Sequence, residues 1–298
     1  MLSLGIDAGG TATRWQLIDA AGAAVAEGQG RPMSGHLFND AVRERSLSAL
    51  SEIIADVLKA GRPGAVCAGI TGLSQGTEAA KTYSDLLAAG FDLPPAKVSV
   101  VDDMWIAYHA AFKPGAGILV YCGTGSVGYH VSVSGEIARA GGHGYIIDDG
   151  GSAFWIARAG IRHLMRDIDE RGEVAWQTPL GWAFAARFGG ASWDLVRSTV
   201  YSGDRGTIAG LAPAVAEAAE TQDLAALTML AEAGAELARL ATVLAMRVGP
   251  KPVILVGGGF KLHPAVTAGV TAALPPAMPV VAPGRSAVEA AAFLARAL

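Results

Sequence analysis

The stretch Ile6-Asp7-Ala8-Gly9-Gly10-Thr11-Ala12-Thr13 lies between two short apolar runs near the start of the printed chain. These runs, at 2–6 and 13–18, predict two strands joined by a turn of glycine and small hydroxyl residues. Glycines let a turn bring backbone N–H groups close to an anion, and the two threonines add hydroxyl donors. Asp7 ends the first strand, where one carboxylate can hold Mg²⁺ through the metal's water shell. A plain Gly-Gly hairpin, with its aspartate capping the turn, also explains these residues.

A second stretch, Tyr121-Cys122-Gly123-Thr124-Gly125-Ser126, repeats this arrangement in the other half of the chain. It follows an apolar run at 117–120 and precedes an alternating run at 127–133, so it also predicts a strand, a turn and a strand. Both turns contain glycine, threonine, a small residue and a hydroxyl residue in that order. Two matching turns therefore predict two related lobes that face one phosphate chain.

The composition of the chain is typical of a globular protein and disfavours several function classes. Its 298 residues are 51% hydrophobic and 17% charged, which predicts a substantial core. A net charge of −4 without a basic cluster disfavours a nucleic-acid partner. There is no charged-then-apolar leader and no apolar run of bilayer length, so we expect no membrane partner and a cytoplasmic location. Cys67 and Cys122 each lie within an apolar run, which predicts two buried thiols.

The order of the predicted elements divides the chain into two lobes, at 1–112 and 113–298. The first lobe is predicted to contain three strands, a helix, a strand, a helix and a strand. Its run at 65–70 is apolar throughout, which is typical of a parallel strand buried on both faces. The lobe therefore belongs to the α/β class.

The second lobe is predicted to start with another three-stranded meander and to carry a long helical insertion at about 152–246. After the insertion we predict strands at 251–256 and 279–281. The closing helix, at 285–298, begins with the capping-box residues Ser286 and Glu289, and we expect that it can pack back on the first lobe.

Two adjacent acids, Asp102 and Asp103, follow the strand predicted at 97–101. Ligands of open α/β sheets bind outside the carboxyl ends of the strands, where a carboxylate can accept a proton from a substrate hydroxyl. An aspartate is also a good cap for the helix predicted at 104–112. The residues alone leave open which of the two acids caps the helix.

Five segments of the chain, in their order and spacing, resemble the BadF/BadG/BcrA/BcrD ATPase family, a branch of the superfamily of actin and the sugar kinases. They are Asp7–Thr11, Asp102–Asp103, Gly123–Ser126, Gly141–Ile156 and Val256–Gly259. The resemblance covers nearly the whole chain and is closer to the N-acetylglucosamine and glucosamine kinases than to other members. It implies two ribonuclease-H-like (actin-like ATPase) lobes, with a helical insertion in the second lobe.

The same resemblance implies an enzyme that transfers phosphate from ATP to the primary hydroxyl of an amino sugar. It implies Asp103 as the base, with Asp102 as cap or support, and Asp7 as the residue that orders the water shell of Mg²⁺. It further implies two lobes that close over MgATP and sugar, and a homodimer whose other partners are ATP and a small-molecule sugar.

The resemblance also implies two sets of binding residues. The nucleotide and phosphate set comprises Gly9, Gly10, Thr11, Thr13, Gly123, Thr124, Gly125, Ser126, Gly257, Gly258 and Gly259. The sugar set comprises Ser34, His36, Thr71, Gly72, Asp103 and Asp149. The chain departs from its relatives at Gly35, where many carry asparagine, and at Gly150, where some carry glutamate. A helix N-terminus, whose dipole favours acids, also explains Asp149.

Other functions remain open at this point. ATPase activators of the same family drive electrons into a dehydratase or a reductase and need cysteines for an iron–sulfur cluster, whereas both cysteines here lie in predicted strands. A plain hexose is an alternative substrate to an amino sugar. A sugar-sensing regulator would need a helix-turn-helix domain ahead of Asp7, where we expect no room.

Overall fold

The computed structural model describes residues 1–298, which form two compact units. Unit 1 comprises Met1–Lys113 and Pro283–Leu298, and unit 2 comprises Pro114–Ala282. Each unit contains one sheet packed against helices, so the predicted α/β class is confirmed. The sequence division assigned the closing helix to the second lobe and allowed it to pack on the first, and in the structure this helix is part of unit 1.

Unit 1 is built on a five-stranded sheet with the order β3-β2-β1-β4-β5. The strands are β1 (Ser3–Ala8), β2 (Thr13–Ile18), β3 (Ala24–Gly30), β4 (Ala65–Ile70) and β5 (Val98–Asp102). The first three form an antiparallel meander, and β1, β4 and β5 are parallel neighbours. Every residue of β4 is buried, because helices cover both faces of the sheet at this strand, and this explains its apolar run.

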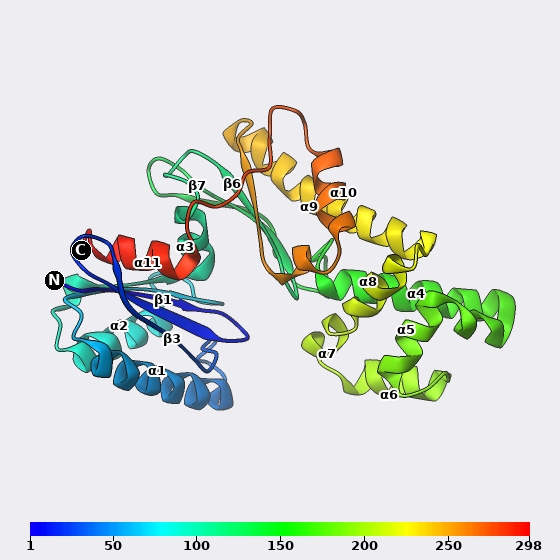
Figure 1. The fold of residues 1–298 in the computed structure, drawn as a ribbon, viewed down its shortest axis with the longest axis horizontal. Helices are drawn as coiled ribbons and strands as arrows, with labels where there is room; N and C mark the ends of the chain where they lie inside the picture. The colour runs from blue at the N-terminus through cyan, green and yellow to red at the C-terminus, as the bar shows by residue number, and fades with distance from the viewer. The chain divides into compact units, whose positions relative to one another are not determined.

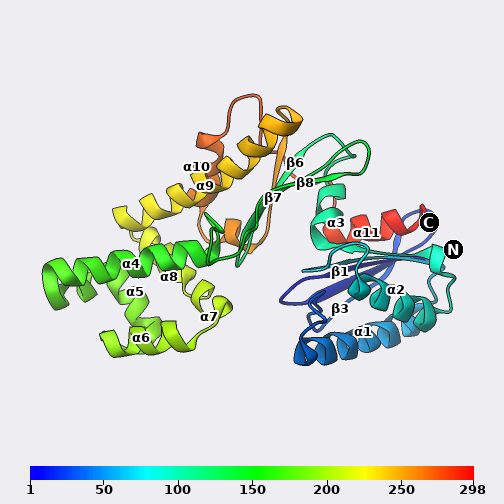
Figure 2. The ribbon, with the colours of Figure 1, turned by 180° about the vertical axis from the view of Figure 1, so that it is seen from behind.

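Four α-helices and one short 3₁₀ helix complete unit 1. They are α1 (Asp40–Ala60), α2 (Glu78–Phe91), η1 (Pro95–Lys97), α3 (Asp103–His109) and α11 (Ala287–Ala295). Helices α1 and α2 lie on one face of the sheet, and α3 and α11 lie on the other (Figures 1 and 2). The capping box predicted for the closing helix is present, with Ser286 and Glu289 each bonded to the other's backbone N–H.

Unit 2 is built on a four-stranded sheet with the order β8-β7-β6-β9. The strands are β6 (Ile118–Cys122), β7 (Ser126–Val131), β8 (Ile137–Gly141) and β9 (Val253–Val256). The prediction of a further strand at 279–281 is wrong, since Val280 forms only an isolated bridge with Val253. Pro279 and Pro283 lack backbone N–H donors, so the pairing cannot extend into a full strand.

The helices of unit 2 lie mainly in the insertion between β8 and β9. They are α4 (Ala153–Arg171), η2 (Gly172–Gln177), α5 (Pro179–Phe188), α6 (Trp193–Ser202), α7 (Arg205–Ala209), α8 (Ala212–Glu220) and α9 (Leu224–Val248), followed after β9 by η3 (Gly258–Lys261) and α10 (Pro264–Ala273). Helix α9 packs on β6, β7 and β8, and α10 packs on α9. No helix of the structure has the length and apolar character needed to span a bilayer.

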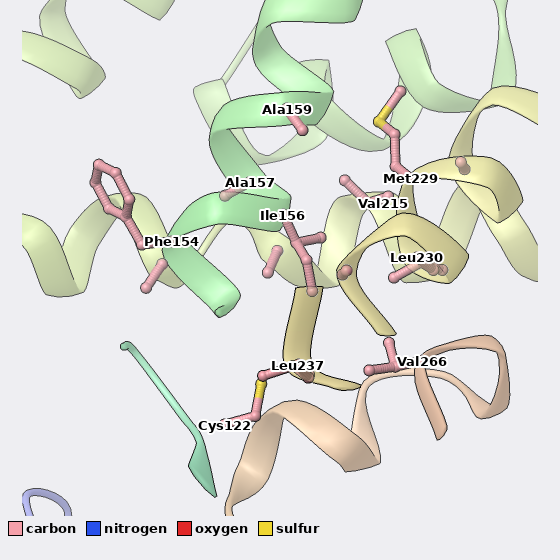
Figure 3. Close-up of a cluster of buried hydrophobic side chains, with 14 of the residues drawn as sticks. Cys122, Phe154, Ile156, Ala157, Ala159, Val215, Met229, Leu230, Leu237 and Val266 are labelled. Atoms are coloured by element: carbon pink, nitrogen blue, oxygen red, sulfur yellow. The ribbon is translucent and has the colours of Figure 1, made fainter. Parts of the chain in front are cut away.

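The core of unit 2 lies where the insertion meets the sheet. Figure 3 shows apolar side chains of α4, α8, α9 and α10 gathered near the end of β6. Among them are Ile156, Val215, Leu237, Val266 and Cys122, all buried. Cys122 is the last residue of β6, so this core anchors the turn that follows it.

Candidate active site

Three predicted site residues of unit 1 lie at the carboxyl ends of its parallel strands. The register pairs Ala8 of β1 with Ile70 of β4, and Ile70 with Asp102 of β5, so the three strands end at one edge of the sheet. Beyond β4, the backbone N–H of Thr71 donates to the Ala8 carbonyl at 2.9 Å. This register brings Asp7, Thr71 and Asp103 together.

The two adjacent acids have different roles in the structure. The carboxylate of Asp102 accepts a hydrogen bond from the backbone N–H of Trp105 at 2.6 Å and caps α3. Asp103 is the first residue of the helix, so its side chain is not needed for the cap. Burial raises the pKa of Asp103 to about 6, and the nearby charges of Asp102 and Asp7 add to the shift. A hydrogen bond with the hydroxyl of Thr71 opposes it.

Asp7 lies in a similar environment. Burial raises the pKa of its carboxyl, and the positive charge of Arg14 offsets only part of this shift. Asp7 and Asp103 therefore place two partly desolvated carboxyl groups near each other, and a cation beside them would relieve their repulsion. The structure contains no group of three or more His, Cys, Asp or Glu side chains that could hold a metal. A site with only the carboxyl groups of Asp7 and Asp103 fits Mg²⁺, because this metal keeps several waters and takes few carboxylates.

The three remaining sugar residues that were predicted in unit 1, Ser34, His36 and Gly72, lie in one patch with Thr71. The N–H of Gly35 donates to the carbonyl of Thr71 at 2.9 Å, and the hydroxyl of Tyr83 donates to the carbonyl of Ser34 at 2.8 Å. The exposed ring of His36 lies against Gly72, since a methyl group built on Gly72 would be 2.7 Å from Nε2. The loop at 34–36 is therefore fastened to the end of β4, beside Asp103.

A pocket of about 570 Å³ adjoins this patch. Besides His36 and Gly72, its walls include Phe38 from the loop before α1, Arg43 from the beginning of α1 and Glu78 from the start of α2. Nothing in the sequence pattern singled out the last three residues, because they come from separate segments that only the fold brings together.

The turn between β1 and β2 exposes some of its predicted phosphate ligands and buries another. The N–H of Gly9 donates to the carbonyl of Ala12 at 3.0 Å, which closes the turn. Gly10 and Thr11 are exposed at its tip. Thr13 is fully buried, and its hydroxyl has no hydrogen-bond partner. The exposed tip is thus the part of the turn that a phosphate can reach directly.

The two glycine turns predicted in unit 2 are adjacent. Strands β6 and β9 are parallel, with Tyr121 opposite Val256, so the turns that follow them emerge at the same edge. Gly257 has a φ of +113°, and a side chain on it would overlap the carbonyl of Cys122. A glycine is therefore required there, and the close contact holds the Gly257–Gly259 turn against the start of the Gly123–Ser126 turn.

Within the Gly123–Ser126 turn, the two hydroxyl residues differ in exposure. Thr124 is exposed, whereas Ser126 is buried and donates its hydroxyl to the carbonyl of Gly150 at 2.7 Å. The N–H of Ala153 donates to the carbonyl of Gly123 at 2.9 Å. These bonds fasten the turn to the beginning of α4.

Asp149, predicted as a sugar ligand in the second lobe, is buried and forms an ion pair that the sequence did not reveal. Its Oδ2 lies 2.9 Å from Nη2 of Arg205, which begins α7. The two residues are 56 positions apart, and no local pattern around Arg205 marks it as a partner. Only the packing of the insertion brings them together.

Both cysteines are buried, as predicted, and they belong to different units. Burial raises the pKa of Cys67 and of Cys122 to about 12, so each is a protonated thiol at neutral pH. A cluster-binding activator needs accessible thiolates, and neither cysteine supplies one in this structure.

Comparison with known proteins identifies the family. The model of the BadF/BadG/BcrA/BcrD ATPase family matches residues 4–278, and the chain belongs to this family. It is 31% identical over 176 residues to an N-acetylmuramic acid/N-acetylglucosamine kinase of Clostridium acetobutylicum. That alignment covers 57% of the chain and 55% of the relative, so the chain spans little more than half of the relative's length.

Two solved structures extend the likeness over the whole chain. A candidate N-acetylglucosamine kinase of Chromobacterium violaceum is 27% identical with a TM-score of 0.77, covering 99% of this chain and 98% of that one. A ROK family glucokinase of Streptomyces griseus, in complex with glucose and AMPPNP, has a TM-score of 0.63 at 18% identity and covers 100% of both chains. The second likeness concerns the fold alone, and together they confirm the actin-like sugar-kinase fold.

Proposed function

We propose that this chain is an ATP-dependent kinase that phosphorylates the primary hydroxyl of an amino sugar, N-acetylglucosamine or glucosamine. The observation that carries the proposal is the placement of Asp103 at the end of a parallel strand with a pKa of about 6. At neutral pH most of this carboxyl is ionised, and its raised pKa makes it a better proton acceptor than an ordinary aspartate. Membership of an ATPase family and the likeness to N-acetylglucosamine kinases support the same reaction.

In the proposed reaction, Asp103 accepts the proton of the sugar's primary hydroxyl. The hydroxyl oxygen then forms a bond to the γ-phosphorus of ATP, and the bond between that phosphorus and the β–γ bridging oxygen breaks to release ADP. Thr71 orients the Asp103 carboxylate through its hydrogen bond. Such transfers depend chiefly on positioning and on charge stabilisation.

Asp7 would hold Mg²⁺ through water, and the metal when bound supplies positive charge that offsets the charge of the phosphates. In unit 1, the exposed residues Gly10 and Thr11 offer an amide and a hydroxyl to a phosphate. In unit 2, the open face at Gly258, where a side chain would meet no atom within 4 Å, leaves room for the flat adenosine group.

The predicted sugar ligands come from one patch of unit 1 and from one acid of unit 2. Ser34, His36, Thr71 and Gly72 form a polar patch beside Asp103, and Asp149 is a further candidate ligand for a sugar hydroxyl. A methyl group built on Gly35 would lie 2.5 Å from the backbone of Leu73, so this loop cannot carry the asparagine of many relatives in the same conformation. Recognition at the 2-position therefore falls to other groups, and both a free amine and an acetamide are admitted.

The alternatives are a kinase for another hexose and an ATPase activator. The buried thiols count against the activator. We also propose, from the family resemblance, a homodimer located in the cytoplasm. Light scattering that gives the mass of a single chain would contradict the dimer.

A coupled ADP-release assay over glucosamine, N-acetylglucosamine and glucose tests the proposal. We expect kcat/KM on one of the amino sugars to exceed that on glucose. Asp103→Asn should lower kcat by about 10²–10⁴, the usual contribution of a general base, with nucleotide affinity unchanged. Asp85→Asn, on the exposed side of α2, is a matched control that should keep full activity.

A clear preference for glucose would contradict the amino-sugar part of the proposal and leave a hexose kinase. Wild-type turnover in Asp103→Asn would show that Asp103 is not the base and would make Asp102 the candidate. ADP release that no sugar stimulates would contradict the kinase as a whole.

A further inference from the structure

Arg205 reaches from the helical insertion to the phosphate turn of unit 2. A side chain built on Gly125 would overlap Nη2 of Arg205 and would lie 2.7 Å from Oδ2 of Asp149. The guanidinium and the carboxylate therefore lie directly against the backbone of the Gly123–Ser126 turn, at the one position of the turn where a side chain would displace them. The sequence gives no sign of this contact, because Arg205 lies 80 residues beyond Gly125.

Asp149 holds the guanidinium in place. Its Oδ2 lies 2.9 Å from Nη2 of Arg205, and its side chain is only 3% exposed, whereas that of Arg205 is 38% exposed. Asp149 has a φ of +55°, and its carbonyl accepts from the N–H of Ser152 at 3.1 Å, so the acid is built into the turn before α4. The carbon at the centre of the guanidinium lies 5.9 Å from the ring centre of Tyr145. Arg205 is thus oriented from two sides while part of it remains accessible.

One donor of Arg205 lacks an acceptor. Its Nε is buried and makes no hydrogen bond, which is unusual because buried polar groups are nearly always satisfied. An arginine presents its N–H groups as a planar fork that matches the oxygens of a phosphate. A partly exposed guanidinium that is fixed directly against a glycine turn and has an unsatisfied donor is suited to bind an anion there.

We propose that Arg205 and the Gly123–Ser126 turn form an anion site in unit 2 that binds the terminal phosphate of ATP. This inference rests on the proposed function and adds to it a phosphate ligand that the glycine motifs do not contain. Asp149 is a positioning residue for Arg205 through Oδ2, which leaves its other carboxylate oxygen for the sugar contact proposed above. In phosphoryl transfer an arginine in this place stabilises the charge on the transferred group.

The test compares nucleotides that differ only in the terminal phosphate. Direct calorimetric binding of a nonhydrolysable ATP analogue and of ADP is measured for wild type, Arg205→Gln and Arg205→Lys. Arg205→Gln should weaken the ATP analogue by about 10-fold or more and leave ADP within about 2-fold, because ADP lacks the group that Arg205 binds. In the sugar assay, kcat should fall by about 10²–10³ while KM for the sugar stays unchanged. Arg205→Lys, which restores the charge without the fork, should recover part of both losses.

Asp149→Asn tests the positioning role. It keeps the shape of the side chain and removes the charge that holds the guanidinium, so the ATP analogue should again lose more affinity than ADP. The matched control is Arg197→Gln, which removes an exposed arginine that also pairs with an aspartate, Asp194 at 3.2 Å, on the neighbouring helix α6. Its binding and turnover should equal those of wild type.

Several outcomes would overturn the inference. Equal losses for ADP and the ATP analogue in Arg205→Gln would show a structural role. A raised KM for the sugar with unchanged nucleotide binding would show that Arg205 serves the sugar through Asp149. If Arg205→Gln fails to fold and Arg205→Lys folds, the affinities for the ATP analogue and for ADP are compared in Arg205→Lys instead. If the wild-type chain binds ADP and the analogue but phosphorylates no sugar, the proposed function is contradicted and the anion site is not. If wild type binds both nucleotides with equal affinity, the anion site itself is contradicted.

Discussion

At the scale of single residues, the carboxyl group of Asp103 is ionised at a free-energy cost. Desolvation is the largest cause of its raised pKa, followed among the unfavourable causes by the negative charges of Asp102 and Asp7. For packing alone, asparagine would have the same shape without this free-energy cost. The presence of a charged group at this buried position therefore favours a chemical role over a structural one.

The titration of Asp103 should be visible in activity. Because the base must be ionised, kcat/KM should decline below pH 6, by about tenfold per pH unit once the carboxyl is protonated. A pH profile measured with a discontinuous assay, so that coupling enzymes do not respond to pH, should give an acid limb with an apparent pKa of about 6. A profile that stays flat to pH 5 would contradict the assignment of Asp103 as the base.

The same titration should appear in stability, with a defined sign. The pKa of Asp103 is higher in the folded chain than the ordinary 3.8, so the folded state binds the proton more tightly. Between about pH 4 and pH 6 the contribution of Asp103 to the free energy of unfolding should therefore fall as pH rises. Above pH 6 its full destabilising effect is present. At pH 8 the free energy of unfolding of Asp103→Asn should exceed that of wild type by about 1–3 kcal/mol, which raises its denaturant midpoint. At pH 4 the variant should lose this advantage. If Asp103→Asn is less stable than wild type at pH 8, the charge of Asp103 does not destabilise the folded chain.

At the scale of elements, the turn Gly257–Gly259 shows how two neighbouring glycines can serve different purposes. A side chain on Gly259 would overlap the sulfur of Cys122, whereas one on Gly258 would meet no atom within 4 Å. Neither has a left-handed backbone conformation, so only the space around them differs. Gly259 keeps β9 and the end of β6 close, and Gly258 keeps the outer face of the turn open.

This difference predicts a contrast between two alanine variants measured without ligand. Gly259→Ala should destabilise the chain by about 1–3 kcal/mol, because the added methyl group overpacks a filled site. Gly258→Ala should change stability by less than about 0.5 kcal/mol and serves as the matched control. Chemical unfolding of both variants provides the comparison, and equal stabilities would contradict the packing argument.

At the scale of the whole molecule, the last helix of the chain completes the first unit. Gly5 of β1 lies so close to α11 that a side chain there would overlap the helix backbone at Val288 and Ala292. Together with α3, the helix covers a small core that contains Cys67 of β4 and Ala291 of α11, both buried. Unit 1 therefore depends on a segment that the chain supplies only after unit 2 is complete.

Removal of residues 283–298 should uncover this face of the sheet. We expect Cys67 to react rapidly with a thiol reagent in the shortened chain under native conditions, while Cys122, in the other unit, stays protected. The full-length chain should label at neither thiol, and Cys67→Ser in the shortened chain should abolish the fast reaction. Should the shortened chain unfold, Ala291→Glu in the full-length chain provides the same exposure by a single change. Slow labelling of Cys67 in both variants would show that α11 does not cover it.

The sequence by itself determined the features that depend on near neighbours in the chain. The alternation and apolar runs predicted the strands of both sheets, with one false strand at 279–281, the two glycine turns lay where strand–turn–strand patterns placed them, and Ser286 begins its helix as a side-chain cap. The order of these elements indicated the fold class, and the five motif segments in their order and spacing were sufficient for the family. Such features are set within a few residues by backbone sterics, capping bonds and the periodicity of burial, so a local pattern contains enough information.

Only the tertiary structure decided which distant residues meet and how strongly each is desolvated. The choice between Asp102 and Asp103 required the cap geometry, and the raised pKa of Asp103 required its burial. The pairing of Asp149 with Arg205 and the closure of unit 1 by α11 join segments with no shared local pattern. Val280 pairs at a single bridge although its local sequence is apolar. These features could not be predicted because burial and long-range contact depend on the packing of the complete chain, and the free energies that set them are properties of the packed core rather than of any short stretch.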